Sequence, residues 1–320
     1  MSPASNLLLL ESAAGDVAPT TSQAGRAQAG PPAEARSVIS RLPGRDLIGL
    51  IPYFAFIAVF LLLPILANVW TSVHDNTGGW TLDSLKKIGT EQYLSAFLNT
   101  MALSAVTALL GGALGLLVAW ALATLERPRW LKSVMLSFSV VASQLGGIPL
   151  AFAFIAAIGS QGMITIAVSD ATGWDLTDAF ALSSFWGLVV VYLYFQVPLM
   201  AILVLPAIMG IRREWSESAR SLGAGRLRYL VQIMLPILSP AIGGAILLLF
   251  ANSFSAFATA SAVSGGGANL IPILIGFFIS GNVLSDQSLG AALATGMMVV
   301  ITLAMLLRHL LVRRTTRWLK

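Results

Sequence analysis

Charge is scarce in this sequence. Only 10% of the 320 residues are charged, whereas an ordinary soluble domain has about 25%. Hydrophobic residues make up 57% of the chain, and the mean hydropathy is +0.83. A soluble globular protein with so few charges could not stay in solution, so the composition favours a membrane protein.

Cysteine is absent and histidine is almost absent. Without cysteine the chain cannot form disulfides, thiolate metal sites or a cysteine nucleophile. The two histidines, His74 and His309, are far apart in the sequence and offer almost no material for a metal cluster or a histidine-based catalytic site. We therefore expect no enzymatic activity and no cofactor or metal in this chain.

The hydrophobic residues are gathered into six long segments. Each can cross a hydrocarbon core about 30 Å thick as a helix of about 20 residues. Helix is expected because a lipid-exposed backbone must satisfy its own hydrogen bonds. The predicted fold class is therefore all-α, a polytopic membrane protein with six transmembrane helices. The predicted spans are residues 47–70, 97–124, 133–158, 184–209, 237–263 and 290–312.

The remaining segments define the domain boundaries. Residues 1–44 are rich in Ala, Ser, Pro and Gly and predict a disordered cytoplasmic tail, with a cleaved signal peptide as the alternative. Residues 45–312 form the six-helix transmembrane domain, and residues 313–320 form a basic cytoplasmic tail. Leu270–Ser280 is apolar but too short to span, so we predict a re-entrant or interfacial helix there.

The basic residues are unevenly placed. Of 19 basic residues, 17 lie near the chain ends or between spans two and three or four and five, and only Lys86 and Lys87 lie on the other side. Basic residues accumulate on the cytoplasmic side of membranes, so both termini are predicted to be cytoplasmic. Membrane orientation also explains the net charge of +5 better than nucleic acid does. The 17 residues are Arg26, Arg36, Arg41, Arg45, Arg127, Arg129, Lys132, Arg212, Arg213, Arg220, Arg226, Arg228, Arg308, Arg313, Arg314, Arg317 and Lys320.

The loop at 211–236, between spans four and five, carries the most informative motif. It contains Glu-Ser-Ala, a glycine four residues later, and an Ile-x-Leu-Pro ending after nine more residues. This spacing resembles the EAA signature of type I ABC importer permeases, with serine in place of the middle alanine. The resemblance covers about residues 47–312. The motif residues are Glu217, Ser218, Ala219, Gly223, Ile233, Leu235 and Pro236.

The resemblance implies a function for this loop. In the family, the corresponding short helix docks on the ATPase subunit and transmits its closure to the membrane helices. Residues 214–222 can form such a helix, and Gly223 can end it because glycine tolerates left-handed backbone angles. The alternative is an ordinary interfacial loop whose arginines bind anionic lipid headgroups.

Within this class, a second set of short matches resembles the permeases of the spermidine/putrescine group. They are residues 254–259, followed by Gly265–Gly267 and Gly290–Ala292. The wider group also covers sulfate, iron, thiamine and phosphonate importers. A polyamine would be expected to prefer carboxylates along its route, and none lies within the predicted spans.

Neutral polar residues within the spans are the candidates for a translocation path. Interhelical hydrogen bonding is the alternative for each of them, although a large amide in lipid needs either a partner or water. No Asp, Glu, Lys or Arg lies at mid-depth, which argues against a proton-coupled transporter. The candidates are Ser143, Gln144, Gln196, Asn252 and Ser255.

The resemblance implies a permease subunit in a bacterial inner membrane. Its partners would be a cytoplasmic ABC ATPase dimer, a second permease subunit of the same or another kind, an extracellular solute-binding protein and membrane lipid, with no nucleic acid.

Residues 111–115 lack the Lys-Ser/Thr of a phosphate-binding loop and predict a tight small-residue helix face. An ion-coupled secondary transporter and an intramembrane enzyme are the rivals. They would need intramembrane charge or paired catalytic groups, respectively.

The charge distribution makes a prediction about topology. Reporter fusions at Lys320 and at Asp175 should show opposite sidedness, because the C-terminal tail is predicted to be cytoplasmic and the connection between spans three and four extracellular. The measurement is paired alkaline phosphatase and fluorescent protein activity in whole cells. The same sidedness at both positions would exclude the six-span topology.

Overall fold

The computed structural model describes residues 44–74, 79–125, 128–174, 177, 180–280 and 286–316. Within these ranges the secondary structure is helical, apart from an isolated bridge between His74 and Trp80. The predicted N-terminal tail lies outside the described residues except for Gly44, and so does the end of the predicted basic tail, residues 317–320. Several residues used for the topology also lie outside: Arg26, Arg36, Arg41, Arg127 and Asp175.

The chain divides into two units, residues 1–55 and 56–320. Helix α1 (Gly44–Ile57) contains all the described residues of the first unit. The helices that follow are η2 (Ala58–Leu62), α2 (Leu63–Ser72), α3 (Asp83–Lys87), α4 (Glu91–Thr124), α5 (Arg129–Gln144), α6 (Ile148–Ile158), α7 (Met163–Thr172), α9 (Phe185–Met209), α10 (Arg213–Ser221), α11 (Arg226–Tyr229), η3 (Leu230–Met234), α12 (Leu235–Phe254), α13 (Phe257–Ser264), α14 (Ile271–Ser280) and α15 (Gln287–Thr316).

Among the described residues, six helical segments are long and apolar enough to cross a membrane. This confirms the predicted all-α architecture with six transmembrane helices. Five of the six overlap the predicted spans over most of their length, and the third is shifted. The segments are Leu50–Ser72, Glu91–Thr124, Ile148–Thr172, Phe185–Met209, Leu227–Phe254 and Gln287–Leu311.

The prediction of one continuous helix over residues 133–158 is wrong. Helix α5 ends at Gln144, and α6 begins at Ile148 after a break. Gly147 in the break has a φ of 78°, a backbone angle that residues other than glycine rarely adopt. Pro149 then occupies the first turn of α6, where a missing N–H does no harm. The Gly-Gly-x-Pro sequence therefore ends one helix and starts another.

The predicted fifth span is also too long at its C-terminal end. Helix α12 ends at Phe254, Ser255 caps it, and α13 follows after Ala256. The short helix predicted at Leu270–Ser280 is confirmed as α14, which contains ten residues and packs on α15.

Glycines allow the central helices α4, α9 and α12 to approach closely. A Cβ atom on Gly111 would lie 2.7 Å from Cβ of Gln196, and one on Gly115 would lie 2.5 Å from the carbonyl oxygen of Val197. Gly112 faces Ile246 of α12 in the same way, with 3.1 Å to its Cγ1. The predicted small-residue face of residues 111–115 is thus confirmed, and it faces two helices at once.

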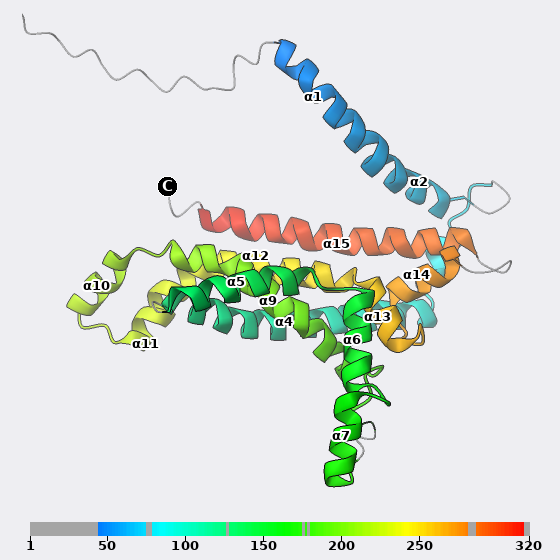
Figure 1. Cartoon of the computed structure of the whole chain (residues 1–320). Helices are drawn as coiled ribbons and strands as arrows, with labels where there is room; N and C mark the ends of the chain where they lie inside the picture. Colours follow the sequence, from blue (N-terminus) through cyan, green and yellow to red (C-terminus); the bar gives the residue numbers. More distant parts are fainter. Residues whose placement is uncertain are drawn as a thin grey trace, which may run out of the picture. The chain divides into compact units, whose positions relative to one another are not determined.

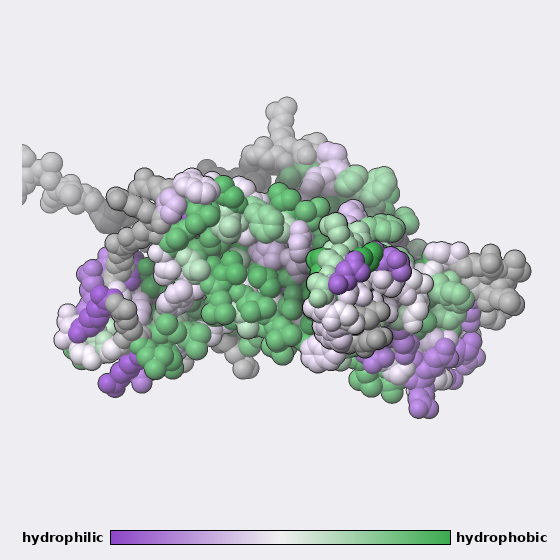
Figure 2. All heavy atoms as spheres, turned by 60° about the horizontal axis from the view of Figure 1, so that its bottom comes forward, coloured by the Kyte–Doolittle hydropathy of each residue, from purple (hydrophilic) through white to green (hydrophobic). Residues whose placement is uncertain are grey.

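In the second unit, α4, α9, α12 and α15 run side by side (Figure 1). The α10–α11 segment lies at one end of this bundle, and α13 and α14 lie at the other end, from which α6 and α7 project (Figure 1). Figure 2 shows a broad apolar band over the visible face of the bundle, with polar residues gathered toward its two ends. This distribution suits a bundle whose sides face lipid.

At the α13–α14 end, Asp286 ties α3 to the start of α15. Its carboxylate accepts hydrogen bonds from the Ser288 hydroxyl at 2.7 Å and from the Leu289 N–H at 3.2 Å, which is the geometry of a helix N-cap. Lys87 lies 3.2 Å from the same carboxylate. Burial would raise the pKa of Asp286, but these hydrogen bonds and the lysine charge outweigh burial and lower the pKa below its usual value. The carboxylate therefore stays ionised at neutral pH.

The close packing of α4 on α9 is testable with one pair of variants. Gly115→Ala should lower the free energy of unfolding by about 1–3 kcal/mol, because the new methyl group meets backbone that cannot move aside. Gly243→Ala, in α12, has open space around its new Cβ and should leave stability unchanged or slightly raised. The measurement is thermal melting of the detergent-purified chain, and equal melting temperatures for the two variants would contradict the packing.

Candidate functional site

The first candidate site is the 211–236 loop at one end of the bundle. Helix α10 begins at Arg213. It carries Glu214 in its first turn and Arg220 in its last turn. Both charges complement the helix dipole, so this short and polar helix is stabilised at each end.

A Schellman motif ends α10. The Ala224 N–H donates to the Ala219 carbonyl at 2.9 Å, and the Gly223 N–H donates to the Arg220 carbonyl at 2.9 Å. Gly223 has a φ of 78°, the left-handed conformation that this motif requires. The prediction that Gly223 terminates the helix is confirmed.

A π-helical turn joins this hairpin to the membrane span. Helix η3 (Leu230–Met234) precedes Pro236, and the Leu235 N–H donates back to the Leu230 carbonyl. Proline provides no N–H, and its ring crowds the carbonyl four residues before it. The π-helical turn is wider than an α-helical turn and accommodates both effects. The same arrangement occurs in the first span, where η2 precedes Pro64.

The motif residues do not all face the same way. Glu217, Ser218 and Gly223 are exposed, while Ala219 is 3% exposed. At the end of the motif, Ile233 is half-buried, whereas Leu235 and Pro236 are exposed. The exposed residues are available to a partner, and Ala219 serves packing.

Two exposed leucines in this loop were not among the predicted site residues. Leu222 is 88% exposed and Leu227 is 76% exposed, one on each side of the Gly223 turn. Their signal in the sequence was an apolar residue on each side of a glycine turn within a charged loop. A large apolar side chain so exposed outside the bundle suits contact with another surface.

The second candidate site lies where two helix breaks meet. The break between α5 and α6 and the break between α12 and α13 border one pocket of about 410 Å³. The residues that line it are Gly146, Gly147, Phe195, Asn252, Ser255, Ala256, Phe257, Ala258 and Thr259.

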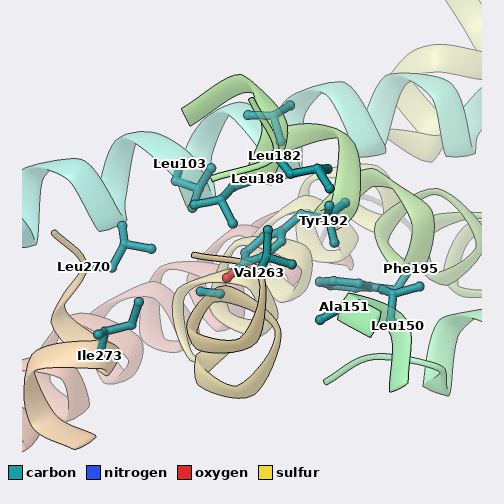
Figure 3. Packing of buried hydrophobic residues seen from close by; sticks show 13 residues of the cluster. Leu103, Leu150, Ala151, Leu182, Leu188, Tyr192, Phe195, Val263, Leu270 and Ile273 are labelled. Carbon is teal, nitrogen blue, oxygen red and sulfur yellow. The ribbon is translucent and has the colours of Figure 1, made fainter. Parts of the chain in front are cut away.

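Hydrogen bonds from neighbouring helices hold both breaks in place. The Gly147 N–H donates to the Thr259 hydroxyl at 2.7 Å, and the Tyr192 hydroxyl donates to the Ala256 carbonyl at 2.8 Å. Tyr192 lies among buried apolar side chains from α4, α6, α9 and α13 (Figure 3). Thr259 was not predicted as a site residue, because a hydroxyl in an apolar segment gives no sign of its partner.

The structure separates the predicted path residues. Asn252 and Ser255 line the pocket, while Ser143 and Gln144 lie at the end of α5 and are not among its lining residues. Gln196 is wholly buried, donates its side-chain N–H to the Leu249 carbonyl at 3.0 Å, and joins α9 to α12. Its Oε1 has no hydrogen-bond partner within the part of the chain that the structure describes.

Comparison with known proteins assigns the chain to a transport family. Residues 111–317 match the family described as binding-protein-dependent transport system inner membrane component. The chain belongs to this family. It is a permease subunit of an importer, a multi-pass membrane protein, and the matches give no support to a secondary transporter.

Individual relatives cover different transport systems. A sulfate transport system permease protein, CysW, from Synechocystis sp. is 24% identical over 263 residues, which are 81% of this chain and 90% of the relative. A spermidine/putrescine transport system permease protein, PotC, from Haemophilus influenzae is 29% identical over 130 residues, 41% of this chain and 49% of the relative. The predicted spermidine-like subgroup is therefore not confirmed, because the relatives include sulfate permeases.

A solved structure shares the fold. A chain of a bacterial ABC transporter involved in the import of the acidic polysaccharide alginate superposes with a TM-score of 0.65, covering 87% of this chain and 98% of that one. The sequence identity is 18%, so the likeness concerns the fold alone.

The link between the two helix breaks generates a prediction. Thr259→Val keeps the shape of the side chain but removes the acceptor for the Gly147 N–H, so it should destabilise the protein by about 1–3 kcal/mol. Thr165→Val is the matched control, because the Thr165 hydroxyl is buried and has no hydrogen-bond partner among the described residues. Thermal melting in detergent measures both, and a Thr259→Val protein as stable as the control would show that the bond contributes nothing.

Proposed function

We propose that the 211–236 loop couples this permease to a cytoplasmic ATPase, with α10 as the docking element. The observation that carries the proposal is the rigid end of α10. A Schellman motif fixes the Gly223 turn, and Glu217, Ser218 and Leu222, which precede this turn, are exposed. A short helix with a fixed end can insert into a groove of a soluble partner and transmit a displacement.

The chemistry of the exposed residues supports a protein partner. Leu222 and Leu227 offer apolar area, and Glu217 offers one negative charge near the Gly223 turn. Lipid headgroups would suit the arginines of this loop but not the exposed carboxylate of Glu217. The π-turn of η3 then joins this docking element directly to α12, so a movement of α10 has a short path into the bundle.

The proposed assembly contains further subunits. One solved relative of the fold is a bacterial alginate ABC transporter in complex with an alginate pentasaccharide-bound periplasmic protein. By analogy, this chain would pair with a second permease, two ATPase subunits and an extracellular solute-binding protein, with both termini in the cytoplasm. The α13–α14 end of the bundle would then face the binding protein.

The pocket at the two helix breaks is the proposed lining of the translocation path. Asn252, Ser255 and Thr259 supply amide and hydroxyl groups beside Phe195 and Phe257. Such a lining can bind a polar solute weakly and release it, which transport requires. It contains no carboxylate, so the pocket does not by itself favour a polyamine over the other solutes that relatives carry.

Two variants test the coupling role. Gly223→Asp should insert normally but lose transport, because it adds a charge at the docking turn and strains the left-handed conformation. Glu217→Lys should do the same by reversing the charge offered to the partner. The measurements are ATPase co-purification and substrate-stimulated ATP hydrolysis in reconstituted vesicles.

The controls are chosen from the same loop. Gly225→Asp adds the same charge two residues away at a position without a positive φ, and Arg228→Ala removes a side chain that is hydrogen-bonded to Gln232. Both should retain most of the coupling. If Gly223→Asp and Glu217→Lys coupled as well as these controls, the loop would be an ordinary membrane-surface connection.

A further inference from the structure

A second and larger cavity lies between α10 and the ends of two spans. Its volume is about 660 Å³, and it is bordered by the last turns of α4 and α9, by α10 and by the α11–η3 segment. The residues that line it are Trp120, Ala123, Thr124, Ile208, Met209, Ile211, Arg212, Ser216, Arg220, Ala224, Tyr229, Leu230 and Met234.

The lining has an apolar floor that is part of the bundle core. Ile208 and Met234 are buried, and Trp120 packs against the same cluster of buried residues. Met209 is 60% exposed at the edge of the cavity. This floor is formed by packed residues of the helix bundle and so belongs to its core.

The opposite wall is positively charged. Arg212 precedes α10, and Ser216 and Arg220 follow at intervals of four residues, which places their side chains along one face of the helix. Neither arginine forms an ion pair with any residue that the structure describes. The acidic residues of α10, Glu214 and Glu217, are not among the lining residues, so the cavity contains two positive charges and no negative one.

The position of the cavity limits its occupant. It lies where α4 and α9 end, at Thr124 and Met209, which is the level of lipid headgroups for helices that span the bilayer. An occupant must place a negative charge between two arginines and apolar groups against a tryptophan and aliphatic side chains. A phospholipid with a net negative charge has this combination, whereas a small inorganic anion would leave the apolar floor uncovered.

We propose that this cavity is a binding site for an anionic phospholipid. Arg212 and Arg220 bind the phosphate, and the glycerol and upper acyl chains lie on Trp120, Ile208 and Met209. The lipid fills the space between α10 and the bundle and holds the docking helix at a fixed distance from α4 and α9. This inference concerns the permease alone and does not depend on the proposed ATPase coupling.

The test uses the full chain, purified without any partner and placed in phosphatidylcholine nanodiscs. Phosphatidylglycerol with brominated acyl chains is added, and its binding is measured by quenching of tryptophan fluorescence. The double variant Arg212→Gln/Arg220→Gln should bind about 30-fold more weakly, because each arginine near an anionic headgroup contributes about a factor of five to six. Trp120→Phe should remove the part of the quenching that comes from the cavity, while quenching of the chain's seven other tryptophans remains.

The control removes the same charge from the same end of the bundle. Lys132→Gln/Arg228→Gln should bind within about twofold of the original protein, since neither residue lines the cavity. Equal binding by the two double variants would overturn the proposal, because it would show a general attraction of charge to the surface.

Two competition arms identify the occupant. Excess inorganic phosphate should not displace the brominated lipid; displacement would show a site for a free anion instead. Addition of a cognate ATPase should also leave the lipid bound. Its loss would show that the cavity belongs to the protein interface and would overturn the lipid assignment.

Discussion

Every peptide group within a bilayer must find a hydrogen bond inside the protein, because lipid offers none. The structure has several interrupted helices and meets this requirement with side chains at three of the breaks. Thr259 accepts the N–H of Gly147, Tyr192 donates to the carbonyl of Ala256, and Thr100 accepts the N–H of Ile271 at the start of α14. The breaks that form the pocket can exist only because neighbouring helices supply these hydroxyl groups.

Close helix packing follows from the same constraint. A hydroxyl from one helix can reach the backbone of another only if the two axes are near each other, and Gly111 and Gly115 remove the side chains that would separate α4 from α9. On the α12 side, where Gly112 faces Ile246, Thr107 of α4 and Ser253 of α12 share a hydrogen bond at 2.8 Å in the buried interior. The interhelical hydrogen bonds therefore depend on the close helix approach that the glycines allow.

The sequence predicted the elements that depend on local chemistry. Span lengths follow from runs of apolar residues, and the end of α10 follows from a glycine at a fixed distance from Glu217. The break at Gly147 was missed, because an apolar segment of 26 residues reads as one continuous span when only its length and hydropathy are considered. Gln196 and Ser255 were placed together as path candidates, but only their tertiary surroundings show that the first joins two buried helices and the second borders a pocket.

The π-turns before Pro64 and Pro236 have a further consequence for the family. Each inserts one additional residue into a helix, and each residue turns an α-helix by about 100°. The buried face of α12 is therefore rotated about the helix axis relative to the residues of α11 that precede it. A relative without the wider turn would need one residue fewer to present the same face to α4 and α9. Single-residue gaps in alignments of such permeases at this place would then record a rotation of the helix face, with no change in the length of the membrane span.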